Sequence, residues 1–194
     1  MTSYDIKKGL EEINHKIYTL SKSKEFLIVS IAGGSCSGKT SVSKKIKGKA
    51  IPMDDYYLGL DKMKDNNFDS PDALDLPLLK LHLGMLKRGA IVDKPIYNFK
   101  THSRVGHEKF TPEKVLIIEG LFALNKILLN TSDLKIFIDC PEELRLRRRI
   151  DRDEVERGRT EESVKKQWVE TVEPMFKKFI LPTEKYADIV IKEF

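Results

Sequence analysis

The sequence has few cysteines and no long apolar run. Cys36 and Cys140 are too few for a disulfide framework and have no CxxC spacing, so we expect reduced thiols and no structural zinc site. No segment approaches the roughly 18 uninterrupted apolar residues that a membrane-spanning helix needs, and the N-terminus lacks the apolar core of a secretory signal. We therefore expect a cytoplasmic protein with no membrane partner.

The composition is that of an ordinary soluble protein with a small basic excess. Its 194 residues fit one α/β domain, since single domains commonly run to roughly 100–200 residues. The 35 basic and 30 acidic residues give a net charge of +5, which suits either a nucleic-acid-binding protein or an enzyme whose arginines converge on a phosphate. The distribution of the charges has to decide between these classes.

Apolar residues follow a helical pattern first and strand patterns later. Five of them recur at three- and four-residue steps near the N-terminus and predict an amphipathic helix: Ile6, Leu10, Ile13, Ile17 and Leu20. Short apolar runs typical of strands buried on both faces occur at 26–31, 115–118, 134–138 and 187–191. Strands that alternate with helices predict a parallel sheet covered on both faces, with ligands at the carboxyl ends of its strands.

Further helices and one insertion are predicted between these runs. A helix is expected from about Leu76 to Leu86, ended by Gly89, and a basic helix begins at Pro141. The segment from about 90 to 111 predicts a hairpin-like insertion outside the main sheet. These elements predict one α/β domain over 25–194, preceded by an amphipathic helical extension over 1–24.

A phosphate-binding motif follows the first predicted strand directly. Eight consecutive residues match GxxxxGK[ST] in its strand-to-helix setting: Gly33, Gly34, Ser35, Cys36, Ser37, Gly38, Lys39 and Thr40. The glycines let backbone N–H groups turn inward around phosphate oxygens, Lys39 would neutralise the β- and γ-phosphates, and Thr40 would bind Mg²⁺. Ser41 completes the expected nucleotide-binding set. The motif implies ATP and Mg²⁺, and eight matched positions disfavour a chance Gly/Ser-rich turn.

A carboxylate is expected beside this motif. Glu119 ends a predicted strand at the position of a Walker B acid, where it would hold the Mg²⁺ shell directly or through water. An isolated Glu at a strand end is often only a turn cap, but the P-loop in the same chain favours the metal role. A guanine-reading Asn-Lys-x-Asp motif is missing, because Asn125-Lys126 is followed by two apolar residues, which argues against a GTPase.

A kinase also needs a carboxylate that takes the proton of the acceptor hydroxyl. Residues 50–52 predict a short strand that would deliver Asp54 to the active edge, with Tyr56 and Tyr57 as an aromatic wall. A polar turn with aromatic anchors explains the same residues equally well from spacing alone. Asp54 is thus a candidate base and a candidate Mg²⁺ ligand.

Arginines gather in the last third of the chain. Arg145, Arg149 and Arg152 share one face of the predicted basic helix, and Arg157 and Arg159 flank a glycine in a segment suited to closing over ATP. An RNA-binding helix is the alternative, but aromatic residues for base stacking are missing from this stretch. The pattern favours a phosphate role and no nucleic-acid partner.

With these residues assembled, the chain resembles the uridine kinase (uridine–cytidine kinase) family, within the wider group that includes phosphoribulokinase and nicotinamide riboside kinase. The resemblance runs from about Leu27 to Ile191. It rests on six strings that occur in the family's order: 67–75 (NFDSPDALD), 95–104 (PIYNFKTHSR), 118–121 (IEGL), 152–153 (RD), 156–159 (ERGR) and 181–188 (LPTEKYAD).

The resemblance assigns roles that spacing alone leaves open. It makes Asp54 the catalytic base, with Lys39 and Arg149 at the transferring phosphate, and it places Asp69 on the ribose hydroxyls. The ATP-closing segment that it implies contains Arg152, Arg157 and Arg159. The residues that it puts around the nucleoside are Tyr57, Phe68, Tyr97, Phe99, His102, Arg149 and Gln167.

The resemblance also implies the fold and the reaction. The fold is a P-loop NTPase-type three-layer α/β/α arrangement with a mostly parallel sheet, a small hairpin-like insertion and an arginine-rich closing segment. The reaction is ATP-dependent 5′-phosphorylation of uridine or cytidine in pyrimidine salvage, and a homo-oligomer stays open because members of the family are often oligomeric. Alternatives are another riboside such as nicotinamide riboside, because Asp54-Asp55 matches a pattern of its kinases, and a non-catalytic P-loop protein. Only residues 41–53 separate Thr40 from Asp54, so we expect an abbreviated sheet edge.

Overall fold

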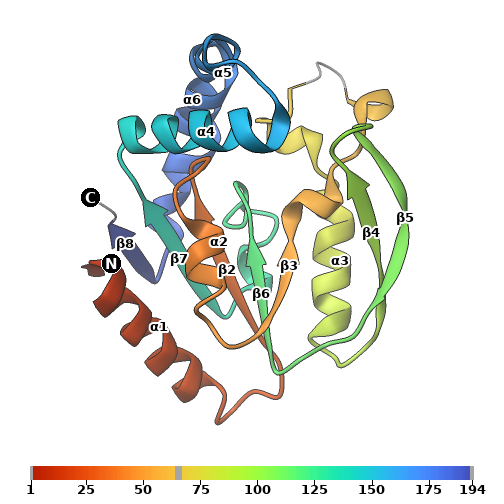
Figure 1. Ribbon diagram of the computed structural model, residues 1–194. Helices are drawn as coiled ribbons and strands as arrows, with labels where there is room; N and C mark the ends of the chain where they lie inside the picture. The colour runs from red at the N-terminus through yellow and green to blue at the C-terminus, as the bar shows by residue number, and fades with distance from the viewer. Residues whose placement is uncertain (1, 64–66, 193–194) are drawn as a thin grey trace.

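A six-stranded sheet forms the centre of the computed structural model, which describes residues 2–63 and 67–192. The strand order is β1-β8-β7-β2-β6-β3, and every adjacent pair is parallel (Figure 1). The strands are β1 (Thr2–Tyr4), β2 (Leu27–Gly33), β3 (Lys49–Pro52), β6 (Val115–Glu119), β7 (Leu134–Asp139) and β8 (Ile189–Lys192). The predicted parallel sheet is confirmed, and β3 is the short strand expected before Asp54.

Helices cover both faces of this sheet, which makes three layers (Figure 1). One face carries α1 (Ile6–Leu20) and α2 (Lys39–Ser43), and the other carries α3 (Leu76–Leu86) and the π-helical segment η6 (Phe176–Ile180). Three more helices continue the chain towards η6: α4 (Glu142–Arg157), α5 (Glu161–Gln167) and α6 (Glu173–Met175). Among the described residues, no helix is both long and apolar enough to cross a bilayer.

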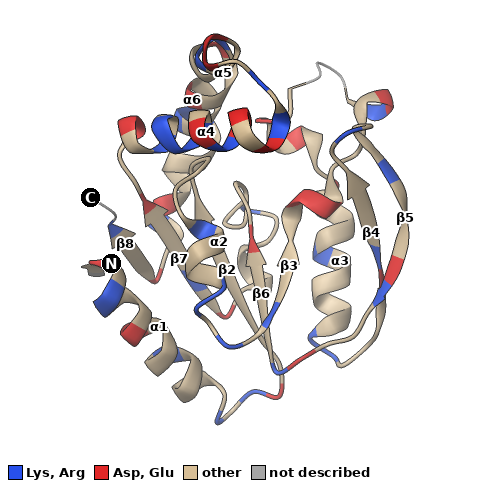
Figure 2. Cartoon of the chain, viewed as in Figure 1, with Lys and Arg blue, Asp and Glu red and all other residues tan. Residues whose placement is uncertain are grey.

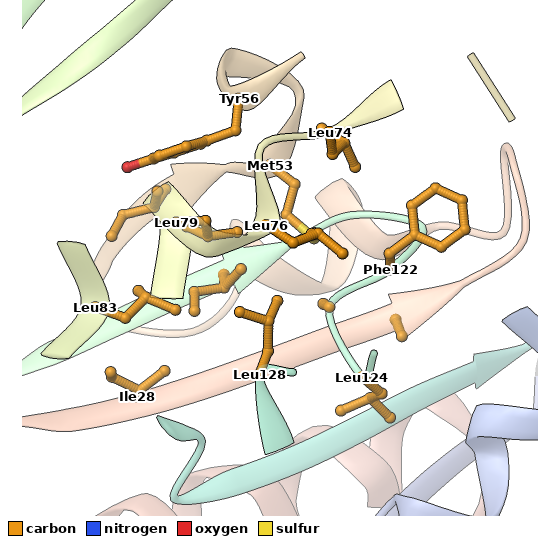
Figure 3. Close-up of a cluster of buried hydrophobic side chains, with 14 of the residues drawn as sticks. Ile28, Met53, Tyr56, Leu74, Leu76, Leu79, Leu83, Phe122, Leu124 and Leu128 are labelled. Atoms are coloured by element: carbon orange, nitrogen blue, oxygen red, sulfur yellow. The ribbon is translucent and has the colours of Figure 1, made fainter. Parts of the chain in front are cut away.

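The alternation of side chains along β2 explains the two apolar layers. Every residue of β2 is buried, and successive side chains point to opposite faces of a strand. Ile28 joins a cluster that contains Met53 and Leu79, shown in Figure 3, whereas Val29 and Ile31 join the cluster beneath α1 and α2. Both faces therefore exclude water, and Ser30, a buried polar residue within β2, pairs its hydroxyl with that of Ser132 at 2.6 Å.

The N-terminal segment adds an edge strand that the sequence did not predict. α1 has the bounds that the periodicity predicts, and the side chain of Asp5 caps it by accepting a hydrogen bond from the backbone N of Lys8 at 2.9 Å. Gly9 allows the helix to lie close to β8, because a Cβ there would come within 2.8 Å of Ile191. β1 pairs with β8, a contact between opposite ends of the chain that three residues of sequence cannot reveal.

The predicted insertion is an antiparallel hairpin of β4 (Val92–Asn98) and β5 (Ser103–Phe110), separate from the main sheet. Its register shifts between Ile96 and Tyr97. The side chain of Asn98 accepts hydrogen bonds from two backbone N–H groups of the following turn, which fixes the end of the hairpin. The expected abbreviation of the sheet edge is also present, since α2 spans only five residues before β3.

Candidate active site at the carboxyl ends of the strands

The P-loop connects the end of β2 to the start of α2. Gly38 has a φ of 94°, a left-handed conformation that favours glycine, at the first turn of α2. The hydroxyl of Ser37 is buried and has no hydrogen-bond partner among the described residues. The ammonium group of Lys39 donates to the carbonyl oxygens of Gly33 at 3.1 Å and Gly34 at 2.7 Å. An unpartnered buried hydroxyl beside this lysine suits an anionic ligand.

Thr40 and Glu119 meet where two neighbouring strands end. The hydroxyl of Thr40 lies 2.9 Å from each carboxylate oxygen of Glu119, because β6 pairs with β2 and ends beside the P-loop. The described residues contain no cluster of three His, Cys, Asp or Glu side chains able to hold a metal. A hydroxyl and one carboxylate nevertheless fit Mg²⁺, which usually keeps several waters and binds substrate phosphates.

Asp54 stands beside this pair. It lies in the 3₁₀ turn η1 (Met53–Tyr56) after β3, which pairs with β6 so that Pro52 is opposite Glu119. The surrounding protein raises the pKa of Asp54, while the charge of Lys39 opposes the rise. The side chain itself is exposed, so a ligand can reach it. Burial lowers the pKa of Lys39, while Glu119 and Asp54 oppose that change.

The arginine-rich helix lies against the P-loop (Figure 1). Arg149 is buried, and it donates to the hydroxyl of Ser35 at 3.0 Å and to the side-chain oxygen of Gln167 at 3.1 Å. Arg145 is also buried, and it pairs with Glu173 at 2.9 Å. Figure 2 shows that acidic residues alternate with the basic ones along α4. The shared face predicted for the arginines is therefore partly neutralised, and Arg149 reaches the P-loop directly.

Asp153 gathers the arginines of the closing segment. Its carboxylate is fully buried and lies 2.8 Å from Arg152, 3.3 Å from Arg159 and 3.6 Å from both Arg149 and Arg157. The sequence reasoning named the four arginines and gave no role to this acid. The available signal was its position four residues after Arg149, on the same helical face.

The remaining P-loop side chains have different surroundings. Ser35 is buried between Arg149 and Cys36, whose sulfur lies 3.9 Å from the Ser35 hydroxyl. Cys36 has a φ of 58°, which is unusual for a residue with a side chain. Ser41 is exposed on α2. The structure thus brings the P-loop residues together with Arg149, and it leaves Ser41 at the periphery.

Five predicted aromatic side chains come together on the hairpin side of the site. Ring centroids lie 5.5 Å apart for Tyr57 and Phe68, 5.4 Å for Tyr57 and Tyr97, 5.2 Å for Tyr97 and Phe99, and 4.9 Å for Phe68 and His102. The hydroxyl of Tyr97 and the Nδ1 atom of His102 are buried without hydrogen-bond partners in the described part of the chain. Such groups are rare unless a ligand completes them.

Asp69 closes the other side of this cluster. It is buried, and its carboxylate oxygen Oδ2 accepts a hydrogen bond from the hydroxyl of Thr171 at 3.1 Å. Burial raises the pKa of Asp69, and Arg149 opposes the rise. Sequence reasoning missed Thr171, which lies between the family strings 156–159 and 181–188 and belongs to neither. The side-chain oxygen of Gln167 accepts from Arg149 and Arg159, so its predicted contact with the nucleoside stays a prediction.

A surface depression beside α5 lies apart from this site. It has a volume of about 380 Å³ and is open to solvent beside α5, where its lining residues are Thr160, Glu162, Ser163, Lys166, Gln167 and Glu170. Most of these side chains are exposed and of mixed charge. Converging polar groups identify a site better than volume does, and they converge at the P-loop.

The chain is similar to known kinases. Residues 58–194 match the model of the Phosphoribulokinase / Uridine kinase family. A uridine kinase of Staphylococcus aureus (strain JH9) is 42% identical over 184 residues, which cover 88% of this chain and 89% of that protein. The predicted resemblance is confirmed by both comparisons.

Solved structures share the fold at low identity. A putative fructose transport system kinase from Silicibacter sp. TM1040 has a TM-score of 0.70 at 16% identity, covering 93% of this chain and 98% of that one. A possible uridine kinase from Bacillus stearothermophilus has a TM-score of 0.54 at 22% identity, covering 93% and 99%. These likenesses support the three-layer P-loop fold alone. The family match over residues 58–194 and the 42% identity to the Staphylococcus aureus protein show that the chain belongs to the phosphoribulokinase/uridine kinase family of P-loop kinases.

Proposed function

We propose that the protein transfers the γ-phosphoryl group of ATP to the 5′-hydroxyl of uridine or cytidine, a step of pyrimidine salvage in the cytoplasm. The observation that carries the proposal is that Tyr57, three residues after Asp54, belongs to the aromatic cluster. A carboxylate beside a P-loop is thereby joined to surfaces that fit a flat ring. The name of the relative, uridine kinase, agrees with this acceptor.

ATP and Mg²⁺ fit the residues present. The hydroxyl of Ser37 and the Nη1 atom of Arg145 are buried donors at the P-loop with no hydrogen-bond partner among residues 2–63 and 67–192, as expected of a cradle for phosphate oxygens. A Cβ on Gly34 would come within 2.7 Å of that Arg145 nitrogen, so the position has no room for a side chain. Thr40 and Glu119 would hold Mg²⁺, which neutralises charge on the β- and γ-phosphates when it is bound.

Three side chains would have separate roles in the transfer. The ammonium of Lys39 would leave the carbonyl oxygens that it contacts and bind the phosphates. Asp54 would accept the proton of the 5′-hydroxyl while the oxygen of that hydroxyl forms a bond to the γ-phosphorus. The bond between the γ-phosphorus and the β-phosphate oxygen breaks at the same time. Arg149, which donates a hydrogen bond to the hydroxyl of Ser35, would stabilise the negative charge of the transferring phosphoryl group. The products are a nucleoside monophosphate and ADP.

The nucleoside would lie between Asp69 and the hairpin. A buried carboxylate that accepts hydrogen bonds favours a sugar diol. The pyrimidine ring would pack against Phe68 and Phe99, and the Tyr97 hydroxyl and His102 Nδ1, which have no partner in the described part of the chain, would bind its edge. Hydrogen-bonding groups of this kind reject ligands that leave them unpaired.

A panel assay tests the proposal. ADP release is measured with ATP and Mg²⁺ against uridine, cytidine, purine nucleosides and nicotinamide riboside, with product mass as a second readout. We expect UMP or CMP with the pyrimidine nucleosides and much lower rates with the others. A preference for nicotinamide riboside would show that this riboside, and not a pyrimidine nucleoside, is the acceptor. ATP binding without any phosphorylated product would favour a non-catalytic P-loop protein.

A further inference from the structure

Thr171 connects the C-terminal helical region to the nucleoside side of the site. Its hydroxyl lies 3.1 Å from Oδ2 of Asp69, a residue 102 positions away in the sequence, and 3.2 Å from the carbonyl oxygen of Gln167. Asp69 is 6% exposed, so few water molecules can compete for its carboxylate. Thr171 donates to Oδ2 of this carboxylate, whereas Arg149 and Arg159 act on it through their charges. The protein therefore holds Oδ2 of Asp69 with a hydrogen bond from Thr171.

The backbone around Thr171 explains why its hydroxyl is fixed in place. It lies in the π-helical segment η5 (Trp168–Val172), where the N–H of Glu173 reaches back to the carbonyl oxygen of Trp168. Pro174 follows, and it has no N–H to continue an α-helical turn. Trp168 is buried and donates to Glu142 of α4 at 3.2 Å. Trp168 before Thr171 and Glu173 after it, which pairs with Arg145 at 2.9 Å, therefore anchor the wide turn on both sides.

A carboxylate binds a diol selectively only if a hydrogen-bond partner such as the Thr171 hydroxyl fixes its orientation. The torsion that rotates a carboxylate plane is soft, so Asp69 alone would present its oxygens at many angles. A hydrogen bond to one oxygen fixes the plane, and each carboxylate oxygen still has a second acceptor position. The two hydroxyls of a ribose have a fixed separation and can pair well with only some of these orientations.

We propose that Thr171 is a positioning residue that orients Asp69 towards the 2′- and 3′-hydroxyls of the nucleoside and so favours ribose over 2′-deoxyribose. The proposal rests on the proposed function. Thr171 acts through Asp69 and does not contact the reacting atoms. It also lies one helical turn after Gln167, whose side-chain oxygen accepts from Arg149 and Arg159. The same short segment therefore joins the diol-binding acid to the arginines beside the P-loop.

The experiment compares Thr171→Val with Thr171→Ser and a matched control. Valine keeps the shape and removes the hydroxyl, whereas serine keeps the hydroxyl. The control is Thr183→Val, because the hydroxyl of Thr183 bonds the carbonyl oxygen of Ile180 at 2.6 Å in the same C-terminal region, away from Asp69. Steady-state KM and kcat are measured for uridine, 2′-deoxyuridine and ATP, and thermal melting reports folding.

For Thr171→Val we expect the KM for uridine to rise about tenfold, the size expected for a hydrogen bond to a charged group. The KM for ATP should stay within about twofold, and the preference for uridine over 2′-deoxyuridine should fall about tenfold. Thr171→Ser should keep the KM for uridine and the sugar preference close to those of the wild type, and Thr183→Val should change neither quantity. Equal changes for uridine and ATP, no rescue by serine, or an unchanged sugar preference would overturn the proposal.

The two proposals fail in different ways. A wild-type protein that phosphorylates no nucleoside contradicts the proposed function, and the role of Thr171 in nucleoside binding with it. A wild-type protein that phosphorylates uridine, together with a Thr171→Val variant that matches it in KM and in sugar preference, contradicts the role of Thr171 alone.

Discussion

The Nζ atom of Lys94 forms an ion pair with the carboxylate of Asp55, the residue that follows Asp54 in η1. Lys94 is 5% exposed and belongs to β4, so the pair fastens the hairpin to the turn that carries Asp54. Glu108 of β5 lies 2.9 Å from the same ammonium group. The two adjacent acids are therefore not equivalent, since Asp55 has a structural partner and Asp54 faces Lys39 and Glu119.

Asp54→Asn should lower kcat by about 10²–10⁴-fold, the usual contribution of general-base catalysis. The KM values for uridine and ATP should change little, because asparagine has the same shape. Asp55→Asn is the matched control, and it should lower the melting temperature with a smaller loss of kcat. The assignment is wrong if Asp54→Asn keeps most of its turnover, or if Asp55→Asn has the larger effect on kcat.

Asp69→Asn should weaken nucleoside binding and stabilise the ligand-free protein at neutral pH. Burial raises the folded-state pKa of Asp69 above its ordinary value of 3.8. At a pH between 3.8 and the raised folded-state pKa, the Asp69 carboxyl is protonated in the folded protein and mostly ionised in the unfolded chain. The contribution of Asp69 to the free energy of unfolding therefore falls as the pH rises. Asparagine removes that loss, since it does not ionise.

Melting temperatures at several pH values check this sign. The Asp69→Asn variant should melt above the wild type near pH 7, and the two proteins should converge as the pH falls towards 3.8. The uridine KM should rise in the variant far more than the ATP KM. A variant that melts below the wild type at neutral pH would show that the ionised carboxylate stabilises the fold.

The fold was largely predictable because its signals are local. The strand β2 has seven consecutive buried residues, and α1 has a regular apolar spacing, so each element is specified by its own segment. The edge strand β1 was missed because its pairing with β8 depends on a contact between the chain ends. The π-helical turns were missed for a related reason, since Pro174 marks an irregularity and does not specify its form.

Gly34→Ala should weaken ATP binding. The new Cβ would lie 2.7 Å from Nη1 and 2.9 Å from Cδ of Arg145, which cannot move away because Cys140 and Glu173 hold its guanidinium. We expect the ATP KM to rise by at least about tenfold, with a loss of about 1–3 kcal/mol in unfolding free energy from overpacking. Gly106→Ala is the control, because a Cβ at Gly106 meets nothing within 4 Å. Equal ATP KM values in the two variants would contradict this prediction.

Asp153→Asn should destabilise the arginine cluster. Asp153 is fully buried and contacts four guanidinium groups, so its loss leaves positive charges without their shared partner. We expect the free energy of unfolding in urea to fall by roughly 3 kcal/mol, as when one partner of a buried ion pair is removed. Asp151→Asn, exposed on the same helix, should leave it within about 0.5 kcal/mol of wild type. Similar values for both variants would show that the cluster does not depend on Asp153.

The candidate site was predicted unevenly. Lys39 and Thr40 follow from a motif whose spacing fixes their chemistry, and the aromatic residues were placed only by the family resemblance. Thr171 could not be found this way, because a threonine in a helical segment has no distinctive spacing, and Asp153 stands in a family string that assigned it no role. Their roles depend on which side chains the fold brings within hydrogen-bond distance.

The most direct test of the central claim is a crystal structure of the protein with uridine, Mg²⁺ and a non-hydrolysable ATP analogue. The account predicts that the 5′-oxygen lies about 3–3.5 Å from the γ-phosphorus, in line with the bond that breaks, and within hydrogen-bond distance of Asp54. A uridine bound away from the P-loop, or a 5′-oxygen that contacts neither Asp54 nor the γ-phosphate, would contradict it.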